Sequence, residues 1–448
     1  MATMKRRNFL KTGLAMTAVG FGPFHILKAG PSANGKLNIA IVGPGRQGSG
    51  NARMLAQTDN IVALCDPDEA LVKKTCGKIK AFSELKIWPD YREMYDKIGK
   101  ELDAVCIATP EHVHYAASMF FIKRGIHVYC QKPLCHTVNE VSLLTEEAKK
   151  HPKVVTQMGH QGHSGSSSAI LRDWGLAETI GPVREVVAYS RKNYWSDKPL
   201  AAPSEPPKTL NWDLWLNRAA KIPFSESFMN RNWIRYSHFS GCVGDMGAHI
   251  LDPAYYALDL RVPLSVHAEV PKRHIEDSLP KAGVITWEFG ARGNKPPVTV
   301  KYYLGPDIPY PRPKHLEEKR KCSALNSGSF MIGEEASIMA GSHSQGARIV
   351  PEAKMKELPR PPQKAFRCKG KNHFQNFTLA CKGEDKAMSS FDYAGPLSEI
   401  IVLGDVALMH PGKKLLWDSE NLKITNDEAA DKSLFMRRLA PRDSLKWC

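Results

Sequence analysis

Two residues in the second half of the chain, Asp245 and His249, have the types and the spacing that acid–base chemistry requires. They are four residues apart, so on a helix they share one face and can interact. A histidine near its ordinary pKa can take the proton of a hydroxyl group that is being oxidised to a carbonyl. The carboxylate could orient that imidazole or bind the substrate. We therefore predict a catalytic role for both residues, with His249 as the base.

Other interpretations of this pair are open. Asp245 could cap a helix N-terminus beside a hydrogen-bonded histidine. The spacings from Asp245 to His249 and from His249 to Asp252 also occur among metal ligands. The sequence offers no convincing further ligand, so we expect no metal site.

Lys132 is the third candidate for chemistry. It follows the strand-like run 126–130 and precedes Pro133, which disfavours helix at the lysine. A lysine at the end of a strand could bind a reacting hydroxyl and stabilise the oxyanion that develops there. The alternative is a solvated surface lysine. We predict that Lys132 is catalytic.

A glycine-rich turn, Gly43-Pro-Gly45-Arg-Gln-Gly48, follows the apolar run 37–42. A strand, this turn and then a helix favour a bound pyrophosphate, because the helix N-terminus offers free N–H groups and the glycines allow close approach. A second apolar run ends in Asp66, 18 residues beyond Gly48. A carboxylate there can accept hydrogen bonds from the ribose diol of NAD and repels the 2′-phosphate of NADP. A tight turn without a ligand is the alternative. We predict NAD, with NADP less favoured.

Candidates for substrate contacts lie just beyond the first predicted domain. The segment 157–164, Gln-Met-Gly-His-Gln-Gly-His-Ser, is polar and sits at a domain junction, a common place for small-molecule binding. It could also be a hinge with solvated histidines. Tyr194 and Trp195 offer rings that can stack on sugars, although core packing is the commoner role. We expect substrate contacts from Gln161, His163, Tyr194, Trp195 and Asp245.

The elements that position these residues fall into two groups. Between residues 36 and 157, short β-rich runs alternate with helical runs, which predicts an N-terminal α/β domain with a doubly wound parallel Rossmann sheet. Residues 158–448 contain β-rich runs at 183–190, 265–270, 284–289, 298–304 and 330–333. They predict a two-layer α+β domain on a largely antiparallel open sheet. Three proline-rich stretches, 198–223, 306–313 and 350–362, are predicted to be surface loops.

The N-terminal segment 1–30 is typical of an export signal. It has no acidic residue, and Lys5, Arg6 and Arg7 precede an apolar stretch at 13–24. The paired arginines indicate the twin-arginine route, so we expect a periplasmic protein. A basic disordered start is the alternative. Because Leu27-Lys28-Ala29 matches a cleavage site poorly, the segment could remain as a membrane anchor.

The composition excludes several classes of partner and site. The net charge of +16 is dispersed, with no basic stripe interleaved with aromatic residues, so we expect no nucleic-acid partner. Ten cysteines occur without a Cys-x-x-Cys pair, which argues against a zinc site or a thioredoxin-like site. We expect mostly free thiols.

Together these stretches resemble the glucose–fructose oxidoreductase, inositol dehydrogenase and rhizopine-catabolism family (Gfo/Idh/MocA). The resemblance rests on the glycine turn 43–48, on Ala108-Thr109-Pro110 with His112 and His114, on Gln131-Lys132-Pro133, and on Gly244-Asp245-Met-Gly-Ala-His249. The segment 157–164, the Trp-Asp-Leu-Trp-Leu run at 212–216 and the Leu-Leu-Trp-Asp run at 415–418 resemble the branch exported by the twin-arginine route.

The resemblance implies roles for individual residues. Lys132 matches the lysine of a Glu-Lys-Pro motif that binds the reacting hydroxyl, and His249 matches the general base. Gln131 stands where the family has an acid, so any tuning of Lys132 by that neighbour is lost. The residues expected to contact the cofactor are Gly43, Gly45, Arg46, Gln47, Gly48, Asp66, Thr109, Pro110, His114, Gln131 and Lys132.

The function expected from these residues is NAD-dependent oxidation of a hydroxyl on a sugar, polyol or glycoside. Since the twin-arginine route exports folded proteins, the cofactor would travel bound and stay bound. A redox-neutral glycosidase, epimerase or sugar–sugar oxidoreductase is therefore the second hypothesis. A non-catalytic sensor of sugar or dinucleotide is the third. The family resemblance further implies a homo-oligomer, a dimer or a tetramer.

Overall fold

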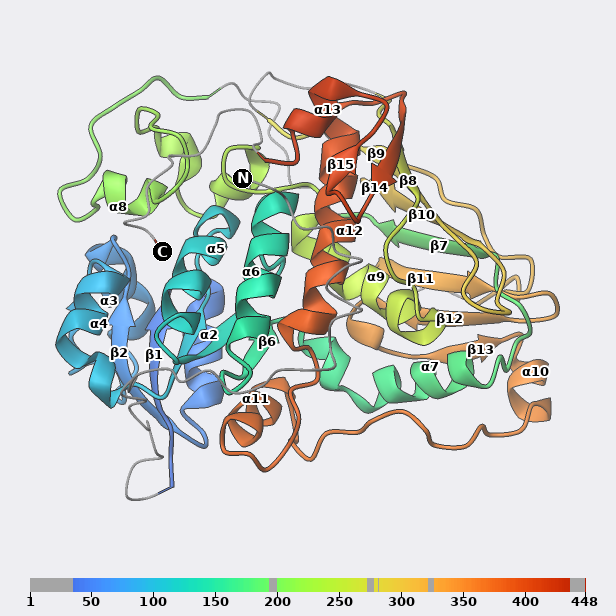
Figure 1. Ribbon diagram of the computed structural model, residues 1–448, viewed down its shortest axis with the longest axis horizontal. Helices are drawn as coiled ribbons and strands as arrows, with labels where there is room; N and C mark the ends of the chain where they lie inside the picture. Colours follow the sequence, from blue (N-terminus) through green and yellow to red (C-terminus); the bar gives the residue numbers. More distant parts are fainter. Residues whose placement is uncertain (1–34, 193–199, 272–277, 281, 321–325, 436–447) are drawn as a thin grey trace, which may run out of the picture.

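The structure, a computed structural model, describes residues 35–192, 200–271, 278–280, 282–320, 326–435 and 448 (Figure 1). The predicted export signal and the two aromatic residues Tyr194 and Trp195 lie outside the described residues.

The first half of the chain forms a six-stranded sheet in the order β3-β2-β1-β4-β5-β6, in which every pairing is parallel. This confirms the predicted Rossmann architecture. Its elements are β1 (Asn38–Val42), α2 (Arg46–Leu55), β2 (Asn60–Cys65), α3 (Glu69–Cys76), β3 (Ile87–Trp88), α4 (Tyr91–Ile98), β4 (Ala104–Ile107), α5 (Glu111–Ile122), β5 (His127–Cys130), α6 (Val138–Lys150) and β6 (Thr156–Met158).

The central strands of this sheet are continuous apolar runs because helices cover both faces. All four residues of β4 are buried, and so is every residue of α5. The helices begin at side chains that accept hydrogen bonds from free backbone N–H groups. Asp68 caps α3, Asp90 caps α4 and Thr137 caps α6. Short strands and capped helices therefore follow from local sequence here.

The second half of the chain forms a nine-stranded sheet in the order β13-β12-β11-β7-β10-β9-β8-β14-β15. Only the pairing of β7 with β10 is parallel, which confirms a largely antiparallel sheet. The strands are β7 (Glu185–Ser190), β8 (Ser265–Glu269), β9 (Gly283–Phe289), β10 (Val298–Leu304), β11 (Ser327–Ile332), β12 (Ser337–Gly341), β13 (Arg348–Val350), β14 (Lys414–Asp418) and β15 (Lys423–Ile424).

Strands β7 and β11 are buried on both faces, whereas β9 and β10 have one packed face and one half-buried face. In β9 and β10 buried residues alternate with half-buried ones along the whole strand. The buried set includes Ile285, Trp287, Val300 and Tyr302. The helices of this half are α7 (Ser166–Leu176), α8 (Trp212–Leu216), α9 (Gly244–Leu258), α10 (Glu352–Glu357), α11 (His373–Cys381), α12 (Phe391–Met409) and α13 (Glu428–Lys432).

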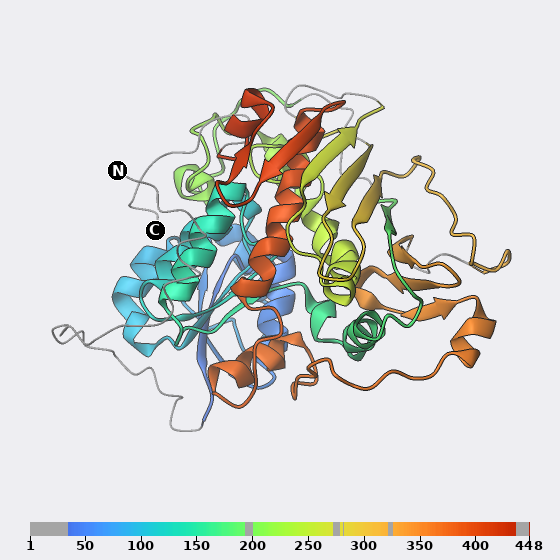
Figure 2. The same ribbon diagram turned by 45° about the vertical axis from the view of Figure 1, so that its right-hand side comes forward.

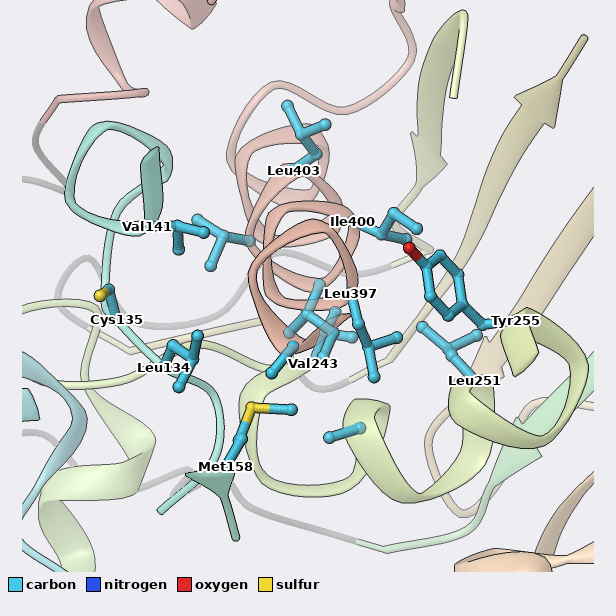
Figure 3. Close-up of a cluster of buried hydrophobic side chains, with 14 of the residues drawn as sticks. Leu134, Cys135, Val141, Met158, Val243, Leu251, Tyr255, Leu397, Ile400 and Leu403 are labelled. Atoms are coloured by element: carbon cyan, nitrogen blue, oxygen red, sulfur yellow. The ribbon is translucent and has the colours of Figure 1, made fainter. Parts of the chain in front are cut away.

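Helix α12 joins the two halves. In Figure 1 it runs between α6 of the Rossmann unit and the second sheet, with α9 beside it. Figure 3 shows Leu397, Ile400 and Leu403 of α12 among side chains from both sides, such as Val141 of α6 and Leu251 of α9. One contiguous apolar core therefore spans the Rossmann unit and the second sheet.

Two of the proline-rich stretches are more structured than predicted. The described part of the stretch 198–223 contains α8 and contributes Leu210, Trp215 and Leu216 to a buried aromatic and aliphatic cluster of its own. The stretch 350–362 contains α10. In the first stretch the aromatic residues between the prolines pack together. The surface-loop prediction is therefore wrong for that stretch.

The described cysteines are all free thiols, and six of them are buried. None of the helices in the same residues combines the length and the apolar character that crossing a membrane requires.

We predict that Leu397→Ala lowers the free energy of unfolding by about 2–5 kcal/mol, because it removes a fully buried side chain from the core shared by the two halves. Chemical denaturation followed by circular dichroism measures the change. Leu264→Ala is the matched control, since Leu264 is 61% exposed and its loss leaves no cavity. Equal destabilisation by the two variants would show that α12 does not carry the shared core.

Candidate active site

The glycine turn lies between the end of β1 and the start of α2. Gly43 has φ +81°, and a Cβ there would lie 2.7 Å from the backbone nitrogen of Thr109. A Cβ at Gly48 would lie 1.9 Å from the carbonyl oxygen of Gly43. No side chain caps α2 at Gly45, so the helix N-terminus is left to a ligand. Both glycines are therefore required by close backbone approach, which fits a turn that receives a pyrophosphate.

Asp66 stands at the end of β2, on the wall of the same cleft. Its carboxylate accepts a hydrogen bond of 2.9 Å from the backbone N–H of Asp68. Burial raises the pKa of Asp66 to about 7, and the nearby charge of Asp68 adds to that effect. A polar ligand that donates to this carboxylate would relieve the cost of burying it, as the diol of a ribose would.

The cleft has a second wall, which comes from the other half of the chain. We call residues 209–240 the covering segment. It contributes Trp215, Phe228, Met229 and Arg231 to the lining, opposite the glycine turn and Asp66. In Figure 1 the covering segment, with α8, lies above α3 and α4 of the Rossmann unit.

Hydrogen bonds fasten the covering segment to the Rossmann unit. The backbone N–H of Glu69 donates to the carbonyl of Thr209 at 3.1 Å, and that of Asn211 donates to the carbonyl of Pro67 at 2.9 Å. A ring nitrogen of His112 lies 3.0 Å from the carbonyl oxygen of Trp215. The cleft is thus lined by two parts of the chain that are far apart in sequence.

Lys132 and Asp245 meet at the carboxyl edge of the Rossmann sheet. The lysine Nζ donates to the Asp245 carboxylate at 2.8 Å and to its backbone carbonyl at 2.6 Å. Arg231 Nη2 lies 3.4 Å and Lys192 Nζ 4.0 Å from the other carboxylate oxygen. Arg231 also lines the cleft, so this cluster of charges adjoins the dinucleotide cleft.

Buried carboxylates from both halves fix the start of α9, where Asp245 lies. Glu111 of α5 accepts from the Ser240 hydroxyl at 2.8 Å and from the Gly241 N–H at 3.2 Å. Asp405 of α12 accepts from the Val243 N–H at 2.9 Å. These bonds satisfy free N–H groups at the helix start and hold α9 at a set position relative to Lys132.

His249 lies one turn further along α9 and is buried. Its ring stacks on His343 with centroids 3.7 Å apart and planes 18° apart. Burial holds the pKa of His249 well below its usual value, and the charges of Lys132 and His343 lower it further. Its Nδ1 is buried and makes no hydrogen bond in the described structure. The imidazole is therefore neutral at neutral pH and able to accept a proton.

The structure places the other predicted cofactor residues in two groups. Those that line the cleft are Gly43, Gly45, Arg46, Gln47, Asp66, Thr109 and Pro110. His114 instead is buried, with its ring nitrogens 2.7 Å from the Pro133 carbonyl and 3.0 Å from the Thr109 carbonyl. His114 therefore contacts the backbone next to Lys132 and does not line the cleft. Gln131 is also buried, and its side chain packs on Gly159.

The predicted substrate residues are also divided. Asp245 is at the site, and Gln161 Nε2 lies 3.5 Å from the hydroxyl of Tyr129. His163 is only 1% exposed, and its Nδ1 lies 3.0 Å from the carboxylate of Asp252. The short 3₁₀ helix η2 (Gln161–Ser164) turns His163 inward under α9, so a substrate does not reach it as the sequence suggested.

Sequence reasoning missed three residues at the site. His343 comes from the turn after β12 with φ +62°, and Arg231 from the covering segment with φ +73°. Lys192 directly follows β7. All three lie in irregular segments without periodicity. The positive φ values were not readable from the sequence, because neither position is a glycine.

Comparison with known proteins agrees with this geometry. Residues 37–160 match the model of the GFO_IDH_MocA oxidoreductase family, NAD-binding Rossmann fold, and residues 167–291 match the model of that family's C-terminal alpha/beta domain. The chain belongs to the Gfo/Idh/MocA family. The six-stranded parallel sheet is thus the NAD-binding domain of that family.

Similarity to individual members is distant. The chain is 25% identical to D-glucoside 3-dehydrogenase of Escherichia coli over 235 residues, 52% of this chain and 57% of that protein. It is 28% identical to inositol 2-dehydrogenase of Salmonella typhimurium over 126 residues, 28% of this chain and 36% of that protein. These matches thus span about a third to three fifths of the length of the relatives.

A solved structure shows the same fold. It is the inositol dehydrogenase homolog of Azotobacter vinelandii complexed with NADH and myo-inositol, with a TM-score of 0.55 and 16% identity. The similarity covers 85% of this chain and 98% of that one. The family's NAD-binding domain includes the glycine turn, Asp66 and the start of α2, which lie within the matched residues 37–160.

We predict that the cofactor-free protein loses stability as the pH rises from about 4 to 7, relative to an Asp66→Asn variant. The folded protein holds the Asp66 proton up to a pKa of about 7, whereas the unfolded chain releases it near 4. The folded state binds more protons than the unfolded state in that window, so the free energy of unfolding falls as the pH rises. Thermal unfolding of both proteins across this range measures the difference. Parallel curves would refute the raised pKa.

Proposed function

We propose that this member of the Gfo/Idh/MocA family oxidises a hydroxyl-bearing carbon of a sugar, polyol or glycoside with NAD. The observation that carries the proposal is the cluster of Lys132, Asp245 and His249 beside the dinucleotide cleft. A cation that can hold an alkoxide and a neutral imidazole that can take its proton are the two groups that such oxidation needs. The names of the dehydrogenase relatives support the substrate class.

Each residue has a role in this reaction. Lys132 binds the substrate hydroxyl and stabilises negative charge as its proton leaves. Asp245 orients the lysine and balances its charge. His249 accepts the proton, because its low pKa keeps the ring unprotonated beforehand. Bound NAD supplies the hydride acceptor, and the residues that would hold it are the glycine turn, Asp66 and the covering segment.

A cofactor that stays bound through many turnovers is part of the proposal. The covering segment supports it, because a dinucleotide between the two walls would contact both halves of the chain. A redox-neutral enzyme, such as a glycosidase, an epimerase or a sugar–sugar oxidoreductase, would return the hydride to a substrate in each cycle. Retention of the cofactor favours this second candidate.

The proposal also includes export of the protein and its assembly into a homo-oligomer. Segment 1–30 supports export to the periplasm through the twin-arginine route, with either cleavage or retention as an anchor. The half-buried face of β9 and β10 supports a homo-oligomer, since Val284 lies there among other half-buried residues. A non-catalytic sensor remains the third candidate, and it would bind sugar or dinucleotide without turnover.

We predict that Lys132→Met lowers turnover by about a hundred- to a thousandfold, because the variant loses oxyanion stabilisation and one end of the ion pair. Reduction of NAD is measured against a panel of glycosides, free sugars and myo-inositol. Lys123→Met, at an exposed position, is the matched control. Full turnover by Lys132→Met would disprove the assignment of Lys132.

We predict that the protein purified without added cofactor carries close to one NAD per chain, because of the covering segment. Native mass spectrometry reports the cofactor, its occupancy and the oligomer mass together. Gly43→Val is the control expected to be empty, because its side chain would overlap Thr109. Empty wild-type protein would argue against retention. Bound NAD with product formed but no net NADH would favour the redox-neutral candidate.

A further inference from the structure

A second cluster of chemically versatile side chains lies beyond His249 along α9. It consists of His160, which follows β6, His163 of η2 and Asp252 of α9. Their nitrogen and oxygen atoms all lie within 4.8 Å of one another. His163 Nδ1 is 3.0 Å and His160 Nε2 3.4 Å from the two carboxylate oxygens of Asp252. This cluster is separate from the Lys132–Asp245 pair.

The cluster is removed from solvent. The relative exposures of His160, His163 and Asp252 are 1%, 1% and 2%. Among the described residues, the ion pairs of Asp252 are with these two histidines, and the hydroxyl of Tyr393 donates a hydrogen bond to the same carboxylate. A buried carboxylate needs a compensating positive charge, because its desolvation is costly. Either a protonated histidine or a bound cation can supply that charge.

His160 favours the cation. Neither of its ring nitrogens makes a hydrogen bond of acceptable geometry in the described structure, although the ring is almost fully buried. Its Nε2 lies 3.4 Å from a carboxylate oxygen of Asp252. An orphaned buried imidazole is rare and costly. A metal ion between these atoms would use the nitrogen as a ligand.

We propose that His160, His163 and Asp252 form a binding site for a divalent transition metal, with Zn²⁺ as the best match. Imidazole and carboxylate ligands suit Zn²⁺, whereas Mg²⁺ and Ca²⁺ prefer oxygen alone. Tetrahedral bonds of about 2.0–2.1 Å place neighbouring ligand atoms about 3.3 Å apart. The two histidines lie 3.0 and 3.4 Å from different oxygens of Asp252, and one ligand atom from each residue lies within 4.8 Å of the others, so small side-chain shifts would bring the three around one ion. A water molecule would complete the four ligands.

The surroundings of the cluster match those of a structural metal site. The ring of His163 packs on Tyr256 at 4.6 Å and on Tyr393 at 4.4 Å between centroids, so aromatic side chains shield the ligands. The hydroxyl of Tyr393 orients the carboxylate of Asp252 from outside the ligand set. The site ties the segment after β6 to α9, three residues beyond His249. Its role is to fix the helix that carries the base.

The test is the metal content of the untagged full-length protein, purified without chelators and measured by elemental mass spectrometry. We expect about one Zn²⁺ per chain in the wild type and less than about a tenth in His163→Asn and Asp252→Asn. His267→Asn is the matched control, because His267 lies half-exposed on β8 and should leave the metal content unchanged. If Asp252→Asn does not fold, His160→Asn replaces it.

A second measurement uses Co²⁺ as the probe. After removal of metal with a chelator, one equivalent of Co²⁺ should give the visible absorption of a tetrahedral site in the wild type and not in His163→Asn. The proposal is overturned if the wild-type protein holds no metal and binds neither Zn²⁺ nor Co²⁺. The three residues would then form a hydrogen-bonded network without a metal. Since neither readout depends on NAD or turnover, this result and the failure of the proposed oxidoreductase activity are distinguishable.

Discussion

The ion pair between Lys132 and Asp245 is the contact on which the arrangement of the site depends, because it joins the two halves of the chain at one point. The lysine follows a strand of the Rossmann sheet, and the carboxylate lies in the first turn of α9. That turn is held from both sides, by Glu111 of α5 and by Asp405 of α12. The neutral base His249 therefore lies at a fixed distance from the cation that would hold the alkoxide.

The packing between the two halves of the chain also forms the cofactor cleft. Helix α12 packs against α6 on one side and against α9 and the second sheet on the other, so the halves share one apolar core (Figures 2 and 3). The covering segment then lies over the Rossmann unit and supplies the second wall of the cleft. A dinucleotide in this cleft contacts both halves. Cofactor binding and the position of the base are thus coupled through the same packing.

Much of the Rossmann part was predictable, because its signals are local. Buried parallel strands appear as apolar runs, and the glycine turn needs small residues where backbones approach closely. The residue types of Lys132, Asp245 and His249 also indicated chemistry. In contrast, the sequence did not reveal that His114 and His163 face inward, since each orientation depends on the packing of a helix or short turn around it. His343 and Arg231 carried no periodic signal at all.

The sequence by itself determined the fold class, the family, the NAD-binding turn and the residues suited to hydride-transfer chemistry. These features rest on interactions between neighbours in the chain or on the burial pattern of single strands. Only the tertiary structure decided which side chains meet. The stacking of His343 on His249, the contact of Arg231 with Asp245 and the gathering of two histidines around Asp252 join segments up to about a hundred residues apart. Contacts of this kind arise from the packing of whole elements, which no local pattern encodes.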